Sequence, residues 1–409
     1  MTDHMRSETP YRWYILTLVA LTNALCVAAP SMCLSVLFDE IAADLRLNLV
    51  QVGLIWSIGA LPGIVTILFA GALGDRFVPR RVLTLGCLLV GLSGGLRGLS
   101  GDFVTLALAM FAFGFLTPAI PMNGFKTVGL WFPRRQLGLA SGVISMGMAL
   151  GFMLGSMVSA TVLSPLLGGW RNVLLLYGAM AMTLCVPWYF TRPAPLVQAS
   201  SGAAVPPSMR RAIVYVAGIR KLWWLGLAIL GIGGCIQGTL GYLPLYLRGA
   251  GWVAASADGA ASLFHLVSMI CVVPIALGSD RLGSRKKVLL PAALLIVAGV
   301  GLLSVVDGAL VWVAVSLAGM VRDGFMAVFM TMIIESEGVG AAYAGTATGF
   351  VMIFSGVGNL LAPPLGNSLA SIAPGAPFLF WAGLAGLGLV GLYTVKERGA
   401  ESSLAAQPA

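Results

Sequence analysis

The sequence predicts an all-α polytopic membrane protein. Of its 409 residues, 58% are hydrophobic and only 10% are charged, whereas soluble domains carry about 25% charged residues. The mean hydropathy is +0.95. Apolar runs recur along the whole chain and are separated by short polar or basic loops. A helix of about 20 apolar residues crosses a bilayer, so the length fits roughly twelve spans and leaves no room for a sizeable soluble domain.

The expected spans follow the apolar runs. In the first half they lie at 13–38, 50–73, 82–99, 103–132, 138–163 and 172–190. In the second half they lie at 222–247, 256–279, 287–305, 309–334, 344–369 and 376–395. We therefore expect an N-terminal six-helix bundle at 1–190 and a C-terminal six-helix bundle with a short tail at 222–409. The segment between them, 191–221, is rich in Pro, Ser and Ala, which is typical of a linker; a short surface helix is expected at 209–219.

The distribution of basic residues predicts the orientation. An even number of spans places both termini on one side, and most of the 24 Lys and Arg residues then fall on that side. An excess of Lys and Arg marks the cytoplasmic side. We expect both termini, the linker and the tail in the cytoplasm, with the chain crossing the inner (cytoplasmic) membrane. The first apolar run is too long for a signal peptide and lacks a small-residue cleavage site, so it is expected to be the first span.

Several function classes are excluded by what the sequence lacks. All six cysteines lie inside expected spans without a CxxC pair, so they are interpreted as packing residues and neither a metal nor a cofactor is expected. The net charge of +9 is spread over short loops and forms no basic face for nucleic acid. No G-x-x-x-x-G-K-[ST] loop is present, which argues against direct use of ATP. The spans hold no paired His, Asp or Cys constellation, so an enzyme is not expected.

A charged motif occurs twice, at equivalent places half a chain apart. After the second span the sequence is Gly71-Ala-Leu-Gly-Asp75-Arg76-Phe-Val-Pro-Arg80-Arg81, and after the eighth it is Gly278-Ser-Asp280-Arg281-Leu-Gly283-Ser-Arg285-Lys286-Lys287. Both resemble the loop signature G-x-L-x-D-R-x-G-R-R/K of the major facilitator superfamily. The first copy departs from it at Val78 and Pro79, and the second at Ala276 and Gly278. The segments Trp131-Phe132-Pro133-Arg134-Arg135 and Gly169-Trp170-Arg171 are similar to further segments of that family.

The resemblance implies 12 transmembrane helices in two pseudo-symmetric six-helix bundles. It also implies a secondary active transporter that moves a small solute by alternating access, for which a monomer suffices. The charges of the two motif copies are implied to latch the halves in the outward-facing state; alternatively, they only set topology. These candidate latch residues are Asp75, Arg76, Arg80, Asp280, Arg281 and Arg285.

Glycines recur in the fifth expected span at near-four spacing, at Gly138, Gly142, Gly147, Gly151 and Gly155. Small residues at this spacing let helices approach closely in lipid. The resemblance places this span along the junction between the halves. The pattern therefore predicts either close helix packing alone or close packing at a moving interface.

Arg322 and Asp323 lie in the middle of the tenth expected span. A charge at that depth costs about 2.5–3.5 kcal/mol on insertion scales, so it faces a cavity or a partner. The resemblance implies that this span lines the central cavity. Arg322 is then suited to bind a carboxylate through paired donors, and Asp323 to exchange a proton. The alternative is an ion pair that only fixes the helix bundle.

Further polar residues inside the spans have two interpretations each. Lys126, in the fourth span, either reaches the cavity and favours an anion or extends toward the cytoplasmic headgroups. His265 either takes part in proton coupling or packs inside the bundle. The remaining candidates bind the solute or form interhelical hydrogen bonds; they are Asn23, Asn123, Gln237 and Tyr242.

The leading hypothesis is a proton-coupled carrier of a small organic anion such as a monocarboxylate. Its expected partners are that anionic solute, protons and membrane lipid, and no nucleic acid. The alternative is an exporter of hydrophobic drugs or metabolites, because 18 methionines and many aromatic residues can line an adaptable cavity. No binding residue of a known anion-carrier branch of the family can be carried over to this sequence. Those branches place their essential Arg in spans that contain no internal Arg here.

Overall fold

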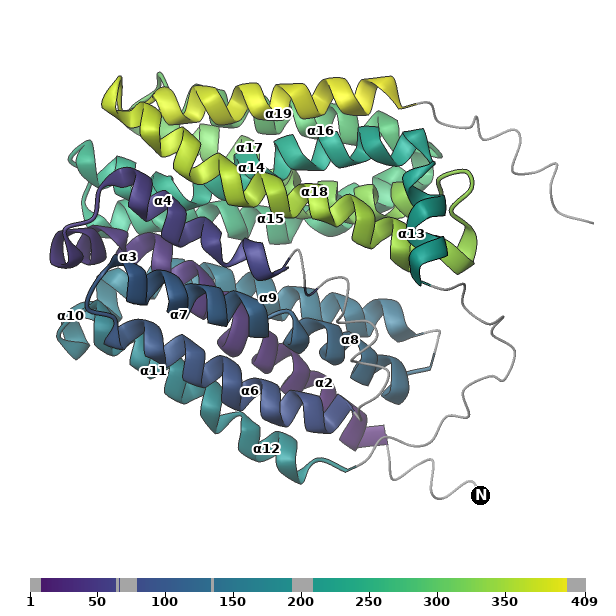
Figure 1. Cartoon of the computed structure of the whole chain (residues 1–409), viewed down its shortest axis with the longest axis horizontal. Coiled ribbons are helices and arrows are strands. Elements are labelled where there is room, and N and C mark those ends of the chain that lie inside the picture. Colours follow the sequence, from purple (N-terminus) through teal and green to yellow (C-terminus); the bar gives the residue numbers. More distant parts are fainter. Residues whose placement is uncertain (1–8, 64–65, 67–78, 134–135, 193–208, 396–409) are drawn as a thin grey trace, which may run out of the picture. The chain divides into compact units, whose positions relative to one another are not determined.

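The computed structural model describes residues 9–63, 66, 79–133, 136–192 and 209–395 (Figure 1). The described residues form helices and short turns, with no strand among them. Spatial clustering divides the chain into two compact units. Unit 1 comprises Met1–Ser201 and Leu247–Ser262, and unit 2 comprises Gly202–Tyr246 and Leu263–Ala409.

The helices of unit 1 follow the expected spans of the first half. They are α2 (Thr9–Thr22), η1 (Asn23–Ala28), α3 (Ala29–Leu45), α4 (Leu49–Ile58), α6 (Pro79–Leu96), η2 (Arg97–Leu99), α7 (Phe103–Leu116), α8 (Ala119–Trp131), α9 (Leu137–Val158), η4 (Ser159–Leu163), α10 (Ser164–Leu167), α11 (Trp170–Thr183) and α12 (Cys185–Phe190). The first three form one run, which ends where Arg46 takes a left-handed conformation with φ 54°. A capping box of Asn48 and Gln51 then starts α4.

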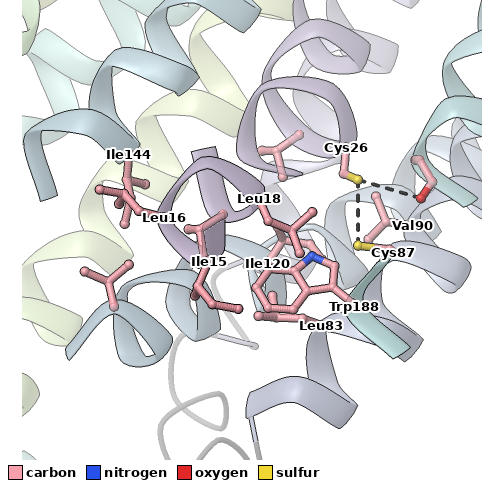
Figure 2. Close-up of a cluster of buried hydrophobic side chains, with 14 of the residues drawn as sticks. Ile15, Leu16, Leu18, Cys26, Leu83, Cys87, Val90, Ile120, Ile144 and Trp188 are labelled. Carbon is pink, nitrogen blue, oxygen red and sulfur yellow. Dashed lines mark hydrogen bonds between the residues drawn. The ribbon is translucent and has the colours of Figure 1, made fainter. Parts of the chain in front are cut away.

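The core of unit 1 lies where α2 meets α6, α8 and α12. Figure 2 shows Ile15 and Leu18 of α2 close to Leu83 of α6 and the indole of Trp188. The Trp188 Nε1–H donates to the Thr22 hydroxyl at 2.9 Å, which satisfies both buried polar groups. In the same core the sulfur atoms of Cys26 and Cys87 lie 3.9 Å apart as free thiols. This agrees with the packing role predicted for the cysteines.

Three glycines of α9 allow close contact with the first helix run. A Cβ atom added at Gly147, Gly151 or Gly155 would lie 2.6–2.8 Å from a backbone oxygen of that run, closer than van der Waals contact permits. The close packing predicted from the glycine spacing is confirmed at these three positions. It is wrong for Gly138 and Gly142, where an added Cβ would meet nothing within 4 Å.

Unit 2 contains the helices of the second half. They are α13 (Met209–Ala217), α14 (Arg220–Gly249), α15 (Ala254–Leu282), α16 (Lys286–Leu302), α17 (Ala309–Ile334), α18 (Gly340–Ser368), η5 (Leu369–Ser371) and α19 (Ala376–Thr394). The last residues of α14 and the first of α15 belong to unit 1. Helix α16 packs against α17 and α19, and the Trp381 Nε1–H of α19 donates to the carbonyl of Ala362 in α18 at 2.7 Å. The expected surface helix is present as α13.

Ten helical segments of the described residues are long and apolar enough to cross a membrane. Helix α16 has 17 residues, and the second expected span, 50–73, is described only as far as residue 63 and at 66. Large apolar side chains such as Leu85, Leu108 and Val313 are more than half exposed. An apolar exterior of this kind suits contact with lipid, since soluble proteins rarely expose large apolar patches. The total of twelve spans remains a prediction.

Candidate functional site

The centre of α17 carries the candidate solute and proton groups of unit 2. Arg322 Nη1 lies 3.1 Å from Asp323 Oδ1, and the two side chains are 22% and 33% exposed. The pair is therefore neither sealed in the core nor fully solvated. A partly exposed guanidinium can bind a second carboxylate in the geometry of its fork. The ion-pair interpretation and the binding interpretation are thus compatible.

Helix α15 contributes two polar residues to the same region. The Ser268 hydroxyl accepts a hydrogen bond at 3.0 Å from the backbone N–H of Asp323. His265 lies one turn before Ser268, is buried, and is close enough to Arg322 to interact with its charge. The two helices approach closely here because Gly319 has no side chain; a Cβ there would lie 2.6 Å from the Phe264 carbonyl oxygen. Arg322, Asp323, His265 and Ser268 form what we call the α15–α17 polar cluster.

Unit 1 holds a separate set of polar residues on η1 and α8. Asn23 and Asn123 are buried, and each donates from Nδ2 to the carbonyl four residues earlier at 2.8 Å. Their Oδ1 atoms are buried and accept no hydrogen bond from a described residue. Asn23 also begins the π-helical stretch η1, an irregularity frequently found at functional sites. Lys126 is half-buried one turn after Asn123.

Two other predicted solute residues lie on α14. Gln237 is half-buried, one turn after Gly233, where a Cβ would lie 3.4 Å from Asn359 Oδ1 of α18. Tyr242 is buried, and its hydroxyl donates to the Pro374 carbonyl at 3.2 Å. Its ring packs against Phe378 at a centroid distance of 5.7 Å. These contacts fix the position of Tyr242 within unit 2, and its role in solute binding stays a prediction.

The second copy of the charged motif forms an ion-pair cluster within unit 2. Arg285 binds Asp280 of the motif at 2.5 Å and Glu335, the residue that caps the end of α17, at 3.0 Å. Arg281 is exposed. In the first copy, the Arg80 guanidinium donates to the Tyr189 carbonyl and lies over that ring. Asp75 and Arg76 lie outside the described residues.

Two buried charges were missed by reasoning from the sequence. Arg97 is fully buried; it donates to the carbonyls of Pro30 at 2.9 Å and Gly94 at 3.1 Å and lies over the Phe113 ring. Asp258 is also fully buried and pairs with Arg248. Both lie inside expected spans, at 82–99 and 256–279. A charged residue inside an apolar run was therefore the signal in the sequence that could have identified both as buried charges.

Comparison with protein families gives a match to the model described as Major Facilitator Superfamily over residues 20–363. The chain belongs to this superfamily. Members of this superfamily are transporters of small solutes, so the expectation of a small-solute transporter is confirmed.

Several relatives carry names of probable transporters for anions. The probable nitrate/nitrite antiporter NarK1 of Thermus thermophilus is 27% identical over 397 residues, which cover 88% of this chain and 86% of that protein. The probable galactarate/D-glucarate transporter GudP of Bacillus subtilis (strain 168) is 29% identical over 204 residues, 45% of this chain and 41% of that protein. The match thus spans less than half of GudP. The probable sulfoacetate transporter SauU of Cupriavidus necator is 25% identical over 159 residues, 38% of this chain and 36% of that protein.

Solved structures agree with the fold. The nucleoside transporter NupG has a TM-score of 0.72 at 15% identity and covers 93% of this chain and 98% of its own. A bacterial homologue of the human lysosomal transporter Spinster, in an inward-facing and unoccupied conformation, has a TM-score of 0.70 at 16% identity and covers 95% of each chain. Identities this low show a common fold, and the transported solute must be argued from the residues.

Proposed function

We propose that this protein carries a small organic anion across the inner (cytoplasmic) membrane by alternating access, coupled to protons. The observation that carries the proposal is Arg322 at mid-depth in α17, half-buried and paired with the neighbouring carboxylate of Asp323. A cation at that depth is costly unless it serves a partner or a solute. The anionic substrates in the names of the relatives support the proposal.

The Arg322–Asp323 pair provides a simple means of coupling. While Asp323 is ionised, it competes with a solute carboxylate for the guanidinium. When Asp323 binds a proton, the competing charge disappears and Arg322 is available to a carboxylate or similar anion. Proton and anion then favour each other's binding, as a symporter requires. His265, next to Arg322, is the second titratable group of the proposed pathway.

Within unit 1, taken by itself, Asn23, Asn123 and Lys126 are proposed as solute-binding residues. The buried Oδ1 atoms of Asn23 and Asn123 have no described donor, and a buried acceptor without a donor is costly. A solute hydroxyl would satisfy either of them, and Lys126 would add a positive charge. This combination suits hydroxylated or short carboxylic acids better than bulky apolar compounds.

We also propose that the halves are 1–190 and 222–409, joined by 191–221, and that the protein acts as a monomer.

An uptake assay with purified protein in liposomes tests the proposal. Radiolabelled galactarate, sulfoacetate, a monocarboxylate and nitrate are compared with a neutral nucleoside and a lipophilic cation, each with and without an inward proton gradient. We expect accumulation of at least one organic anion, increased by the gradient and abolished by a protonophore. Uptake or export of only the neutral or cationic compounds would contradict the proposal and favour the exporter of hydrophobic compounds.

A further inference from the structure

A second ionic cluster lies in unit 1, at the N-terminal end of α15. The charged motif lies at the opposite, C-terminal end of this helix. Asp258 Oδ1 accepts a hydrogen bond at 2.6 Å from Nη2 of Arg248, in the last turn of α14. The Asp258 side chain is 0% exposed and that of Arg248 is 11% exposed. Asp258 is therefore more deeply buried than Asp323 of the α15–α17 polar cluster.

Arg248 also binds the first helix run. Its Nη1 donates to the backbone carbonyl of Val36 in α3 at 2.7 Å. The guanidinium thus joins α3 to the carboxylate at the start of α15. The neighbouring residue Ser262 adds a contact with α9, since its hydroxyl lies 3.3 Å from the Met153 carbonyl.

The cluster has more negative than positive charge when all its members are ionised. The charged groups that face Asp258 are Arg248 from α14 and Glu40 from α3, while α9 contributes only the Met153 carbonyl through Ser262. Glu40 Oε2 accepts from the Ser164 hydroxyl at 2.6 Å. The atoms Asp258 Oδ2 and Arg248 Nε are buried and have no hydrogen-bond partner among the described residues. Two carboxylates and one guanidinium leave an unbalanced negative charge, which a buried site can remove by taking up a proton.

We propose that Asp258 is a proton-binding site whose protonation releases Arg248 from its contact with α3. Proton uptake converts the Asp258 carboxylate to the neutral acid, with the proton supplied by water at that end of the helices. The neutral acid no longer holds the guanidinium in place by charge, so the hydrogen bond from Arg248 to the Val36 carbonyl loses its support. The role of this site in transport rests on the proton coupling proposed above. The binding of a proton to Asp258 is independent of that proposal.

Infrared difference spectroscopy of the reconstituted full chain tests proton binding without any solute. Spectra at mildly acidic and mildly alkaline pH are subtracted, and the C=O stretching band of protonated carboxyl groups is followed. We expect a band in the wild type that is missing from Asp258→Asn. In Glu40→Gln the band should be retained but should appear only at lower pH, because one of the two negative charges is removed. Identical difference spectra for the wild type and Asp258→Asn would overturn the proposal. Arg248→Gln serves as a second variant, in which the band should appear at higher pH; an unchanged pH would also overturn it.

Transport assays in liposomes then separate this inference from the proposed function. In Asp258→Asn we expect gradient-driven accumulation of the anion to fall about tenfold or more, with anion exchange in the absence of a gradient retained. Wild-type accumulation in Asp258→Asn would overturn the inference and leave the proposed function standing. If the wild type transports no anion while its infrared band still depends on Asp258, the proposed function fails and the proton site stands.

Discussion

Arg285 binds Glu335 through two parallel hydrogen bonds, from Nε to Oε2 at 3.1 Å and from Nη2 to Oε1 at 3.0 Å. The pair joins the turn after α15 to the end of α17. The hydrogen bonds to Glu335, followed by the one to Asp280, raise the pKa of Arg285 above its ordinary range. Arg285 is therefore charged at neutral pH. Within unit 2, the acid of the duplicated motif is held by the Arg five positions later.

We predict that Arg285→Gln destabilises the protein more than Arg281→Gln does. Arg285 holds two carboxylates, and Glu335 is 53% exposed, so each pair contributes at the modest level of a solvated ion pair, up to about 1 kcal/mol. Thermal unfolding in detergent measures the effect, which should shrink as salt is added. Arg281 is exposed and is the matched control. Equal losses in the two variants would show that the Arg285 contacts are not responsible.

A second prediction concerns the glycines of α9. In Gly151→Ala the new Cβ would lie 2.6 Å from the Ala24 carbonyl oxygen, so the helices must separate, at a typical cost of about 1–3 kcal/mol for overpacking. Gly142→Ala meets nothing within 4 Å, and the higher helix propensity of Ala should leave the stability unchanged or raise it by up to about 1 kcal/mol. Thermal unfolding of both variants decides. A Gly151→Ala protein as stable as Gly142→Ala would contradict the close contact between α9 and η1.

A third prediction is a pH dependence at the start of α7. Asp102 accepts from the Thr105 backbone N–H at 2.8 Å and from its hydroxyl at 3.1 Å, and these hydrogen bonds lower the pKa of Asp102. A lowered pKa contributes stability that is present above the unfolded value of about 3.9 and is lost as the pH falls through the folded value. Asn is an equally good cap that does not titrate. The difference in Tm between the wild type and Asp102→Asn should be constant near neutral pH. At pH values below about 4, the wild type should lose stability relative to the variant. A difference that does not vary with pH would rule out this effect.

Much of the helix layout could be predicted because membrane spans leave a strong local signal. The run predicted at 309–334 coincides with α17, and that at 376–395 ends one residue after α19. In both cases the apolar run stops at a turn or a charged residue, which is local information. The π-helical stretch η1 has no such signal, since its residues are as apolar as those of the α-helices beside it.

Partners across helices could not be predicted in the same way. The residue Arg285 was recognised from the motif, whereas its partner Glu335 lies 50 positions away in sequence and is brought close only by the packing of α15 and α17. For Asp258, likewise, the ion pair with Arg248 and the nearby charge of Glu40 depend on how α3, the end of α14 and the start of α15 meet. The placement of Arg322 at mid-span was predictable from its position in the apolar run, because the cost of a buried charge is a local property.

The central claim is that the charge of Arg322 binds the anion, and the affinity of Arg322 variants for that anion tests it most directly. Titration calorimetry on purified protein, using the anion found in the uptake screen, compares the wild type with Arg322→Lys, Arg322→Gln and the control Arg281→Gln. A hydrogen bond to a charged group contributes about 1.5–3 kcal/mol, so Arg322→Gln should weaken binding by about 10- to 150-fold. Arg322→Lys should recover part of that loss, and Arg281→Gln should bind as the wild type does. An Arg322→Gln protein that folds and binds the anion with wild-type affinity would contradict the account.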